Sequence, residues 1–174
     1  MTNQILKNIA RFILLLLLQV LVFDNIRIAS FLVPQVYILC LLLLPFETPK
    51  WLILATGFLM GFLVDLFSYT IGLHTAACTL IVFIRPFVVR IIASKEQYEP
   101  GIQPGIKGLG FRWFLTYTLV MVSVHHLFVY LMEQFRFIGF FTFMYRSILN
   151  ILITTMAIAL VQILLTSPFK TKRN

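Results

Sequence analysis

Apolar residues run along this chain in long stretches that are broken only by short polar ones. An α-helix needs about 20 apolar residues to cross the hydrocarbon core of a membrane, with a range of about 17 to 25. The polar residues gather in the breaks and are not spread at the helical or strand spacing that gives a soluble domain its polar face. The pattern therefore predicts an all-α integral membrane protein, with residues 1–174 as a single polytopic domain.

Six apolar segments are predicted to form transmembrane helices. Their approximate bounds are 9–23, 31–44, 51–67, 73–92, 113–132 and 140–165. The first is interpreted as a retained helix and not as a signal peptide, because no small-residue cleavage pattern follows it. The second is the shortest, with Pro34 and Pro45 near its ends. It suits either a short helix in a thinned bilayer or a re-entrant segment.

One long polar connection separates the fourth and fifth segments. Residues 94–112, "SKEQYEPGIQPGIKGLGFR", contain two prolines and four glycines, which predicts a loop with little regular structure. The external connections are short, so no external domain is expected.

Lysine and arginine are distributed unevenly between the two sides of this arrangement, and such asymmetry sets the orientation of a membrane protein. An even number of helices with both termini in the cytoplasm places the following basic residues on the cytoplasmic side: Lys7, Arg11, Lys50, Arg90, Lys95, Lys107, Arg112, Lys170, Lys172 and Arg173. The opposite side receives only Arg27 and Arg136. The loop 94–112 is therefore expected to be cytoplasmic.

Composition supports a membrane protein and argues against a nucleic-acid partner. The chain is 60% hydrophobic and only 11% charged, which is far from the composition of a soluble domain. Its net charge of +8 sits at the ends of segments, and not on one soluble face with interleaved aromatic residues. The positive charge is interpreted as topological.

The stretch "GFLMGFLVDLFSYTIGLH", residues 57–74, places an acid in an apolar helix. Gly57 and Gly61 form a GxxxG pattern, which allows a neighbouring helix to approach the backbone closely. Asp65 lies one turn further along the same face, about 21 Å from Trp51 and so in the outer half of the bilayer. Two interpretations stay open: a helix-end acid that accepts hydrogen bonds from the turn "SYTIG", or an outward-facing polar site shared with His74.

The fourth and sixth segments carry further polar positions. Arg85 precedes Pro86, which kinks a helix, and Arg85 is expected either to form an internal polar site with His74 or to snorkel to the cytoplasmic interface. Arg146, Asn150 and Thr154 follow one another at helical spacing and are expected to face protein. Arg146 is a candidate for a charge-assisted pair with Asp65 or Glu133. In the fifth segment, the adjacent His125 and His126 point about 100° apart and do not share a face.

Motifs of catalysis and of metal binding are missing from the sequence. It contains no GxSxG, HExxH or Walker pattern. Cys40 and Cys78 both lie inside apolar segments and lack metal-site spacing. We therefore expect no enzyme activity, no metal and no cofactor.

Residues 57–74 resemble the signature segment of the MreD family of rod shape-determining membrane proteins, in which a glycine-spaced helix ends in Asp-Leu followed by a serine-containing turn and a glycine. Supporting matches are "LLLQ" at 16–19, "FDN" at 23–25, Pro34 and Asn150, and the resemblance is dense over residues 14–85. The family's motif positions fall on Gly57, Gly61, Asp65, Ser68 and Gly72. The loop 94–112 matches no feature of the family.

The resemblance implies a six-helix protein of the bacterial inner membrane, similar in fold to the substrate-binding components of ECF-type vitamin transporters. It also implies a scaffold role in the elongasome, the complex that carries out peptidoglycan synthesis for rod cell shape. The direct partner would be MreC, alongside MreB, RodA and the associated transpeptidase. The resemblance implies no enzymatic activity.

Two functions from different classes remain. In the first, the chain is a membrane scaffold that binds MreC through packing faces such as Gly57 and Gly61 and through its short external loops. In the alternative, it is a small-molecule binding or transport component with a central polar pocket, for which the candidate residues are His74, Arg85, Arg146 and Asn150. Whether these polar side chains converge on one open cavity distinguishes the two.

Overall fold

The computed structural model describes residues 2–25, 32–70, 72–92, 102–133 and 140–166. Its elements are α1 (Thr2–Leu18), the π-helix η1 (Gln19–Phe23), α2 (Ile38–Leu42), α3 (Lys50–Ser68), α4 (Leu73–Ile92), α5 (Ile106–Leu109), α6 (Phe111–Glu133) and α7 (Phe140–Thr166). Five helices are long and apolar enough to cross a membrane: α1 continued by η1, α3, α4, α6 and α7. The all-α, multi-pass membrane architecture is thereby confirmed for the described residues.

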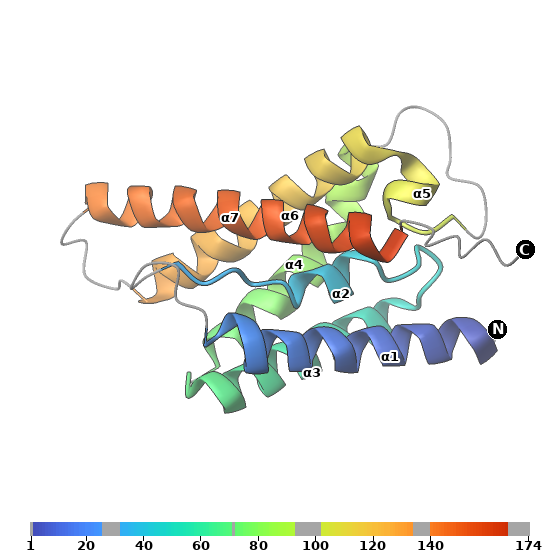
Figure 1. Ribbon diagram of the computed structural model, residues 1–174, viewed down its shortest axis with the longest axis horizontal. Coiled ribbons are helices and arrows are strands. Elements are labelled where there is room, and N and C mark those ends of the chain that lie inside the picture. Colours follow the sequence, from blue (N-terminus) through green and yellow to red (C-terminus); the bar gives the residue numbers. More distant parts are fainter. Residues whose placement is uncertain (1, 26–31, 71, 93–101, 134–139, 167–174) are drawn as a thin grey trace, which may run out of the picture.

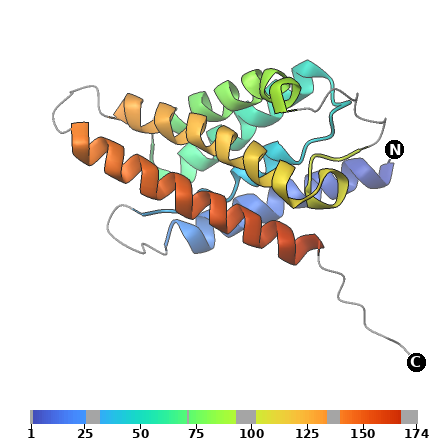
Figure 2. The same cartoon turned by 90° about the horizontal axis from the view of Figure 1, so that it is seen from above.

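The long helices lie side by side; α1, α3 and α6 run in one direction, and α4 and α7 run in the opposite direction (Figures 1 and 2). The hairpin of α3 and α4 is the most closely packed pair; α4 also packs on α6, and α6 on α7. Helix α1 lies at the edge, against α2 and α3. The start of α1 and the end of α7 lie at the same end of the molecule (Figure 1).

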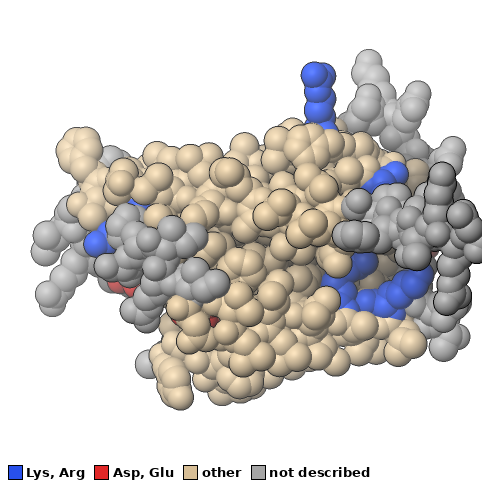
Figure 3. Space-filling model, in the orientation of Figure 1, with Lys and Arg blue, Asp and Glu red and all other residues tan. Residues whose placement is uncertain are grey.

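Charged side chains differ between the two ends of the molecule (Figure 3). We call the end where α1 begins the basic end; its described basic residues are Lys7, Arg11, Lys50, Arg90, Lys107 and Arg112. We call the opposite end the far end, where Asp24, Asp65, Glu133 and Arg146 lie. The predicted positions of Arg27, Lys95, Arg136, Lys170, Lys172 and Arg173 fall outside the described residues.

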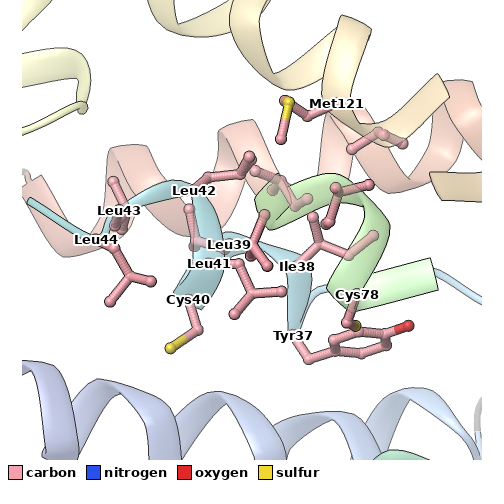
Figure 4. Close-up of a cluster of buried hydrophobic side chains, with 14 of the residues drawn as sticks. Tyr37, Ile38, Leu39, Cys40, Leu41, Leu42, Leu43, Leu44, Cys78 and Met121 are labelled. Atoms are coloured by element: carbon pink, nitrogen blue, oxygen red, sulfur yellow. The ribbon is translucent and has the colours of Figure 1, made fainter. Parts of the chain in front are cut away.

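The second predicted helix, 31–44, is not a continuous helix. From residue 32 to 37 the chain has no regular helix, and α2 adds only five helical residues. This stretch, residues 32–44, is named here the central segment. It runs from the far end back to the basic end between the long helices (Figure 1). From Val36 to Leu44 its residues are 0–7% exposed, packed among side chains of the surrounding helices, with Cys78 beside Tyr37 (Figure 4).

Length explains this departure from the expected helix. A 14-residue α-helix rises only about 21 Å, against roughly 30 Å of hydrocarbon. An extended residue advances about 3.3 Å. With residues 32–35 extended and the others in turn or helical conformation, the central segment covers about 27 Å, although it is one residue shorter than the predicted helix.

Part of the predicted loop 94–112 is also more ordered than expected. Helix α5 and the first residues of α6 lie within it. Pro104 and Gly105 are buried, and a Cβ on Gly105 would lie 2.9 Å from the Gln162 amide of α7. This half of the loop therefore packs against the end of α7. The preceding residues, 93–101, fall outside the described part of the chain.

Candidate functional site

Asp65 lies near the end of α3, where its carboxylate receives hydrogen bonds from the start of α4. Thr75 donates from its backbone N–H at 2.8 Å and from its Oγ1 at 2.6 Å. The backbone N–H of His74 donates at 3.0 Å, and the Nδ1 of its ring lies 3.0 Å from the same carboxylate oxygen. Thr70 donates from its Oγ1. The carboxylate thus caps α4 from a different helix, because free N–H groups of a first helical turn need such an acceptor.

Both interpretations of Asp65 describe part of this arrangement. The acid does hold the turn between α3 and α4, and it does contact His74 as an ion pair when that ring is protonated. The candidate pair of Arg146 with Asp65 is not formed, and the alternative pair of Arg146 with Glu133 stays a prediction. Arg146 occupies an exposed position of α7 and is not among the hydrogen-bond partners of Asp65.

Gly57 and Gly61 allow α4 to approach the backbone of α3. A Cβ on Gly61 would lie 2.5 Å from the carbonyl oxygen of His74 and 2.5 Å from Cα of Thr75. A Cβ on Gly57 would lie 2.6 Å from a methyl group of Val82. The glycine face is therefore covered by α4 of the same chain. The expectation that it packs against a partner's helix is wrong for this structure.

The turn between α3 and α4 uses left-handed backbone at two places. Tyr69 has φ 56° and Gly72 has φ 71°. Glycine adopts this conformation without steric cost, and Gly72 thereby sends the chain into α4. The Tyr69 side chain is 94% exposed at the far end of the molecule.

Ser68 connects this hairpin to α1. Its Oγ donates to Asp24 Oδ2 at 3.0 Å, and Asp24 Oδ1 accepts from Gln19 Nε2 at 2.8 Å. Gln19 is 1% exposed and opens the π-helical turn η1. Such turns are frequent at functional sites, since they shift the face that a side chain presents.

Gln19 also holds the beginning of the central segment. Its Oε1 accepts the backbone N–H of Val36 at 2.8 Å, and its Nε2 donates to the Pro34 carbonyl at 3.1 Å. One side chain amide thus satisfies a donor and an acceptor of non-helical backbone.

The polar stripe on α7 serves the same segment from the other side. Asn150 Oδ1 accepts the Val33 N–H at 3.2 Å, and Thr154 Oγ1 accepts the Gln35 N–H at 3.2 Å. Asn150 and Thr154 therefore face protein, as their spacing predicts, whereas Arg146, the first residue of the predicted stripe, occupies an exposed position.

Arg85 holds the end of the central segment. Its Nε donates to Tyr117 Oη at 2.9 Å, and its Nη2 donates to the Leu44 carbonyl. Its guanidinium carbon lies 5.6 Å from the centre of the Phe46 ring, within cation–π range. Arg85 is 3% exposed. It therefore lies inside the protein and does not snorkel to the interface.

These contacts share one physical purpose. Non-helical backbone at membrane depth is tolerated only where protein or water satisfies its hydrogen-bonding groups. Here side chains of four surrounding elements do so: Gln19 of η1, Arg85 of α4, Tyr117 of α6, and Asn150 and Thr154 of α7. These five buried side chains thus hold the central segment in place by hydrogen bonds to its backbone or to one another.

The two adjacent histidines of α6 take part on different faces, as their spacing predicts. His125 Nε2 lies 3.1 Å from Tyr37 Oη, and His126 Nε2 lies 2.9 Å from Thr154 Oγ1. The rings of His74 and His125 are 6.4 Å apart, centre to centre. A row of polar side chains thus leads from Asp65 toward the middle of the molecule.

The structure brings some of the predicted site residues together and keeps others apart. Gly57, Gly61, Asp65, Ser68 and Gly72 all lie in the α3–α4 hairpin, with His74 against Asp65. The four pocket candidates do not converge. Their positions are His74 at the hairpin, Arg85 at the opposite end of the central segment, Asn150 at the start of that segment, and Arg146 on an exposed face of α7.

Sequence reasoning did not assign several residues that complete the arrangement. They are Thr70, Thr75, Tyr37 and Tyr117, which donate or accept at the positions described above. Thr and Tyr are common in spanning helices, so their hydrogen-bonding roles have no signature in the sequence. Among the described residues, no three side chains of His, Cys, Asp or Glu are grouped so as to hold a metal ion.

Comparisons with family models, curated proteins and solved structures gave no match for this chain.

Proposed function

We propose that this protein is a non-enzymatic membrane scaffold of the cell-wall elongation machinery, which acts like MreD by binding MreC and so helps to maintain rod cell shape. The observation that carries the proposal is the clustering of the residues on which the resemblance rests. Gln19, Asp24, Pro34 and Ser68 come from three separate segments, and hydrogen bonds join them into one unit. Asp65 lies one turn from Ser68 in the same hairpin.

The interior of the protein is filled by its own chain, which supports a scaffold function over a ligand-binding pocket. Arg85, Asn150 and Gln19 all hydrogen-bond to the central segment, which fills the middle of the bundle. A ligand in that place would have to displace buried backbone contacts. Recognition is therefore assigned to the outside of the protein, and the small-molecule alternative becomes an outcome of the test below.

The far end is the part of the described chain that suits a periplasmic partner. Tyr69 projects from the turn between α3 and α4 with 94% of its surface exposed. Aromatic residues of this kind are typical of the membrane–water interface and of protein contacts. MreC would dock on this turn, with MreB, RodA and the transpeptidase joining through the assembled complex.

In this proposal the protein lies in the bacterial inner membrane and crosses it six times, with the central segment as the second crossing. The basic end faces the cytoplasm, in keeping with the positive-inside rule. The described basic residues of that end, together with the same-end position of the start of α1 and the end of α7, support this orientation. Likeness to the binding components of ECF-type transporters is part of the proposal.

The test is site-specific photocrosslinking in living cells. A benzophenone amino acid replaces Tyr69 at the far end or, as matched control, Phe111 at the basic end, which is 46% exposed. We expect only the Tyr69 position to crosslink to a single-span protein with a periplasmic coiled coil, which also co-purifies in stoichiometric amount. The proposal fails if no such protein is recovered and a small molecule extracted from the membranes raises the melting temperature instead.

A further inference from the structure

Arg11, like Arg85, is a cation inside a spanning helix, but the surroundings of the two side chains differ. It lies six residues after Ile5, the first residue of the apolar span Ile5–Phe23, which is about 9 Å along the helix axis. The Cα of Arg11 thus lies within the third of the hydrocarbon nearest the basic end, and the long side chain reaches the headgroup region by snorkelling toward that end. Charged residues inside spans are costly and therefore have a partner.

The part of the chain that the structure describes gives Arg11 little compensation. Its side chain is half-buried, and its hydrogen bond there is a long one of 3.4 Å from Nη1 to the neutral Asn8 Oδ1. The ion pair of Asp65 with His74 lies at the other end of the molecule. Arg85 by contrast has two hydrogen bonds and an aromatic ring. The guanidinium of Arg11 retains donors for an anion.

Neighbouring positions of α1 suit an amphiphile. Lys7 precedes Arg11 by one helical turn on the same face and is exposed. Leu14 continues that face toward the middle of the membrane and is 55% exposed. The face is therefore cationic at headgroup depth and apolar below it. Figure 3 shows Lys and Arg side chains gathered at this end of the molecule.

The position of α1 leaves this face open to lipid. Helix α1 is the most peripheral of the five long helices. Only 11% of the residues in its most apolar stretch are buried inside the protein, against 33–44% for the other four helices. Lys7 and Leu14 on this face are exposed and Arg11 beside them is half-buried, so a phospholipid approaches Arg11 from the bilayer along these two side chains.

We propose that Lys7, Asn8 and Arg11 bind the phosphate headgroup of an anionic phospholipid in the leaflet at the basic end. The planar guanidinium donates two parallel hydrogen bonds to phosphate oxygens, the Lys7 ammonium adds a second positive charge, and the acyl chains lie along Leu14. This site does not depend on the scaffold function.

The experiment uses the full chain in a mild neutral detergent. Thermal unfolding is followed with added phosphatidylglycerol, phosphatidylcholine or inorganic phosphate, and bound lipid is counted by native mass spectrometry. The variant is Arg11→Gln. The matched control is Arg112→Gln, which removes an exposed cation of the same end from α6.

We expect phosphatidylglycerol to stabilise the unaltered protein and Arg112→Gln more than phosphatidylcholine does, and to remain bound in the mass spectrometer. Arg11→Gln should weaken apparent binding about tenfold, because a charge-assisted hydrogen bond is lost. If Arg11→Gln does not fold, Lys7→Gln serves in its place and should give a smaller loss. Equal lipid preference in the Arg11 (or Lys7) and Arg112 variants overturns the site. An equal shift with inorganic phosphate overturns the lipid as its occupant.

Discussion

At Asp65, a single carboxylate receives donors from the first turn of α4 and from the turn before it. Replacing Asp65 by Asn keeps the shape of the side chain but puts an NH2 group, which is a donor, in place of one of the two oxygens that accept hydrogen bonds. If that group replaces Oδ2, it faces the Thr75 N–H, which donates there at 2.8 Å. We expect Asp65→Asn to lower the free energy of unfolding by about 1–3 kcal/mol, the cost of a buried donor left without its acceptor. Unfolding in detergent, followed by circular dichroism, measures this.

Ser68→Ala is the control for that experiment, because it removes one hydrogen bond of the same hairpin, to Asp24, and leaves the Asp65 cap intact. It should cost less than Asp65→Asn. Equal losses in the two variants would mean that the cap has no special weight in the hairpin.

The two glycines of α3 predict different responses to an added methyl group. At Gly61 the obstacle is backbone of α4, which has no freedom to move aside, so Gly61→Ala should lose about 1–3 kcal/mol through overpacking. At Gly57 the nearest atoms belong to the Val82 side chain. The double variant Gly57→Ala/Val82→Ala should therefore regain part of the stability that Gly57→Ala loses. Thermal unfolding of these variants and of the parent protein checks this. A Gly61→Ala protein as stable as the parent would contradict the close approach of α4 to the backbone of α3.

Among the elements, the central segment is the one that sequence reasoning misjudged. Its apolar run and its length suited either a short helix or a re-entrant segment. The structure shows instead an extended stretch followed by five helical residues. Hydrophobic pattern does not separate a buried extended segment from a buried helix of this length. The deciding information lies in Gln19, Asn150 and Thr154, which are distant in the sequence and close in space.

The long helices were easier to predict, because a spanning helix satisfies its own backbone and needs no knowledge of its neighbours. The observed bounds of α3 and α4 lie within a residue of those expected. Which faces of the helices pack against one another was harder to predict from the sequence. The GxxxG face was open to either an internal or an external helix, and only the structure shows that α4 covers it.

Loosening of the central segment is testable with a native reporter. Cys40 lies in α2 and is 3% exposed. Gln19→Leu leaves the Val36 N–H and the Pro34 carbonyl without their partner, so we expect the segment to detach more often and Cys40 to react faster with a maleimide. The experiment is done in a Cys78→Ala background, so that Cys40 is the single thiol. Thr116→Val, which removes only a hydrogen bond within α6, is the control. Unchanged Cys40 labelling in Gln19→Leu would mean that Gln19 does not hold the segment.

For the whole molecule, the charge asymmetry and the course of the central segment both favour a topology in which the central segment crosses the membrane. If the segment crosses the membrane, the start of α1 and the start of α3 lie on the same side, although only one long helix separates them. If it is re-entrant, they lie on opposite sides. The basic residues at both starts, Lys7 and Lys50, favour the crossing.

Substituted cysteines decide between these topologies. In a background without Cys40 and Cys78, single cysteines are placed at Lys7, Lys50 and Tyr69, all of which are exposed. We expect a membrane-impermeant maleimide added to intact spheroplasts to label the Tyr69 position alone, and to label the other two only after the membrane is opened. Labelling of Lys50→Cys together with Tyr69→Cys would place both ends of α3 outside, which no spanning helix allows. Labelling of Lys50→Cys without Tyr69→Cys would invert α3 and make the central segment re-entrant. Only the pattern with Lys7 and Lys50 protected fits a second crossing made largely of non-helical chain, held by the side chains of its neighbours.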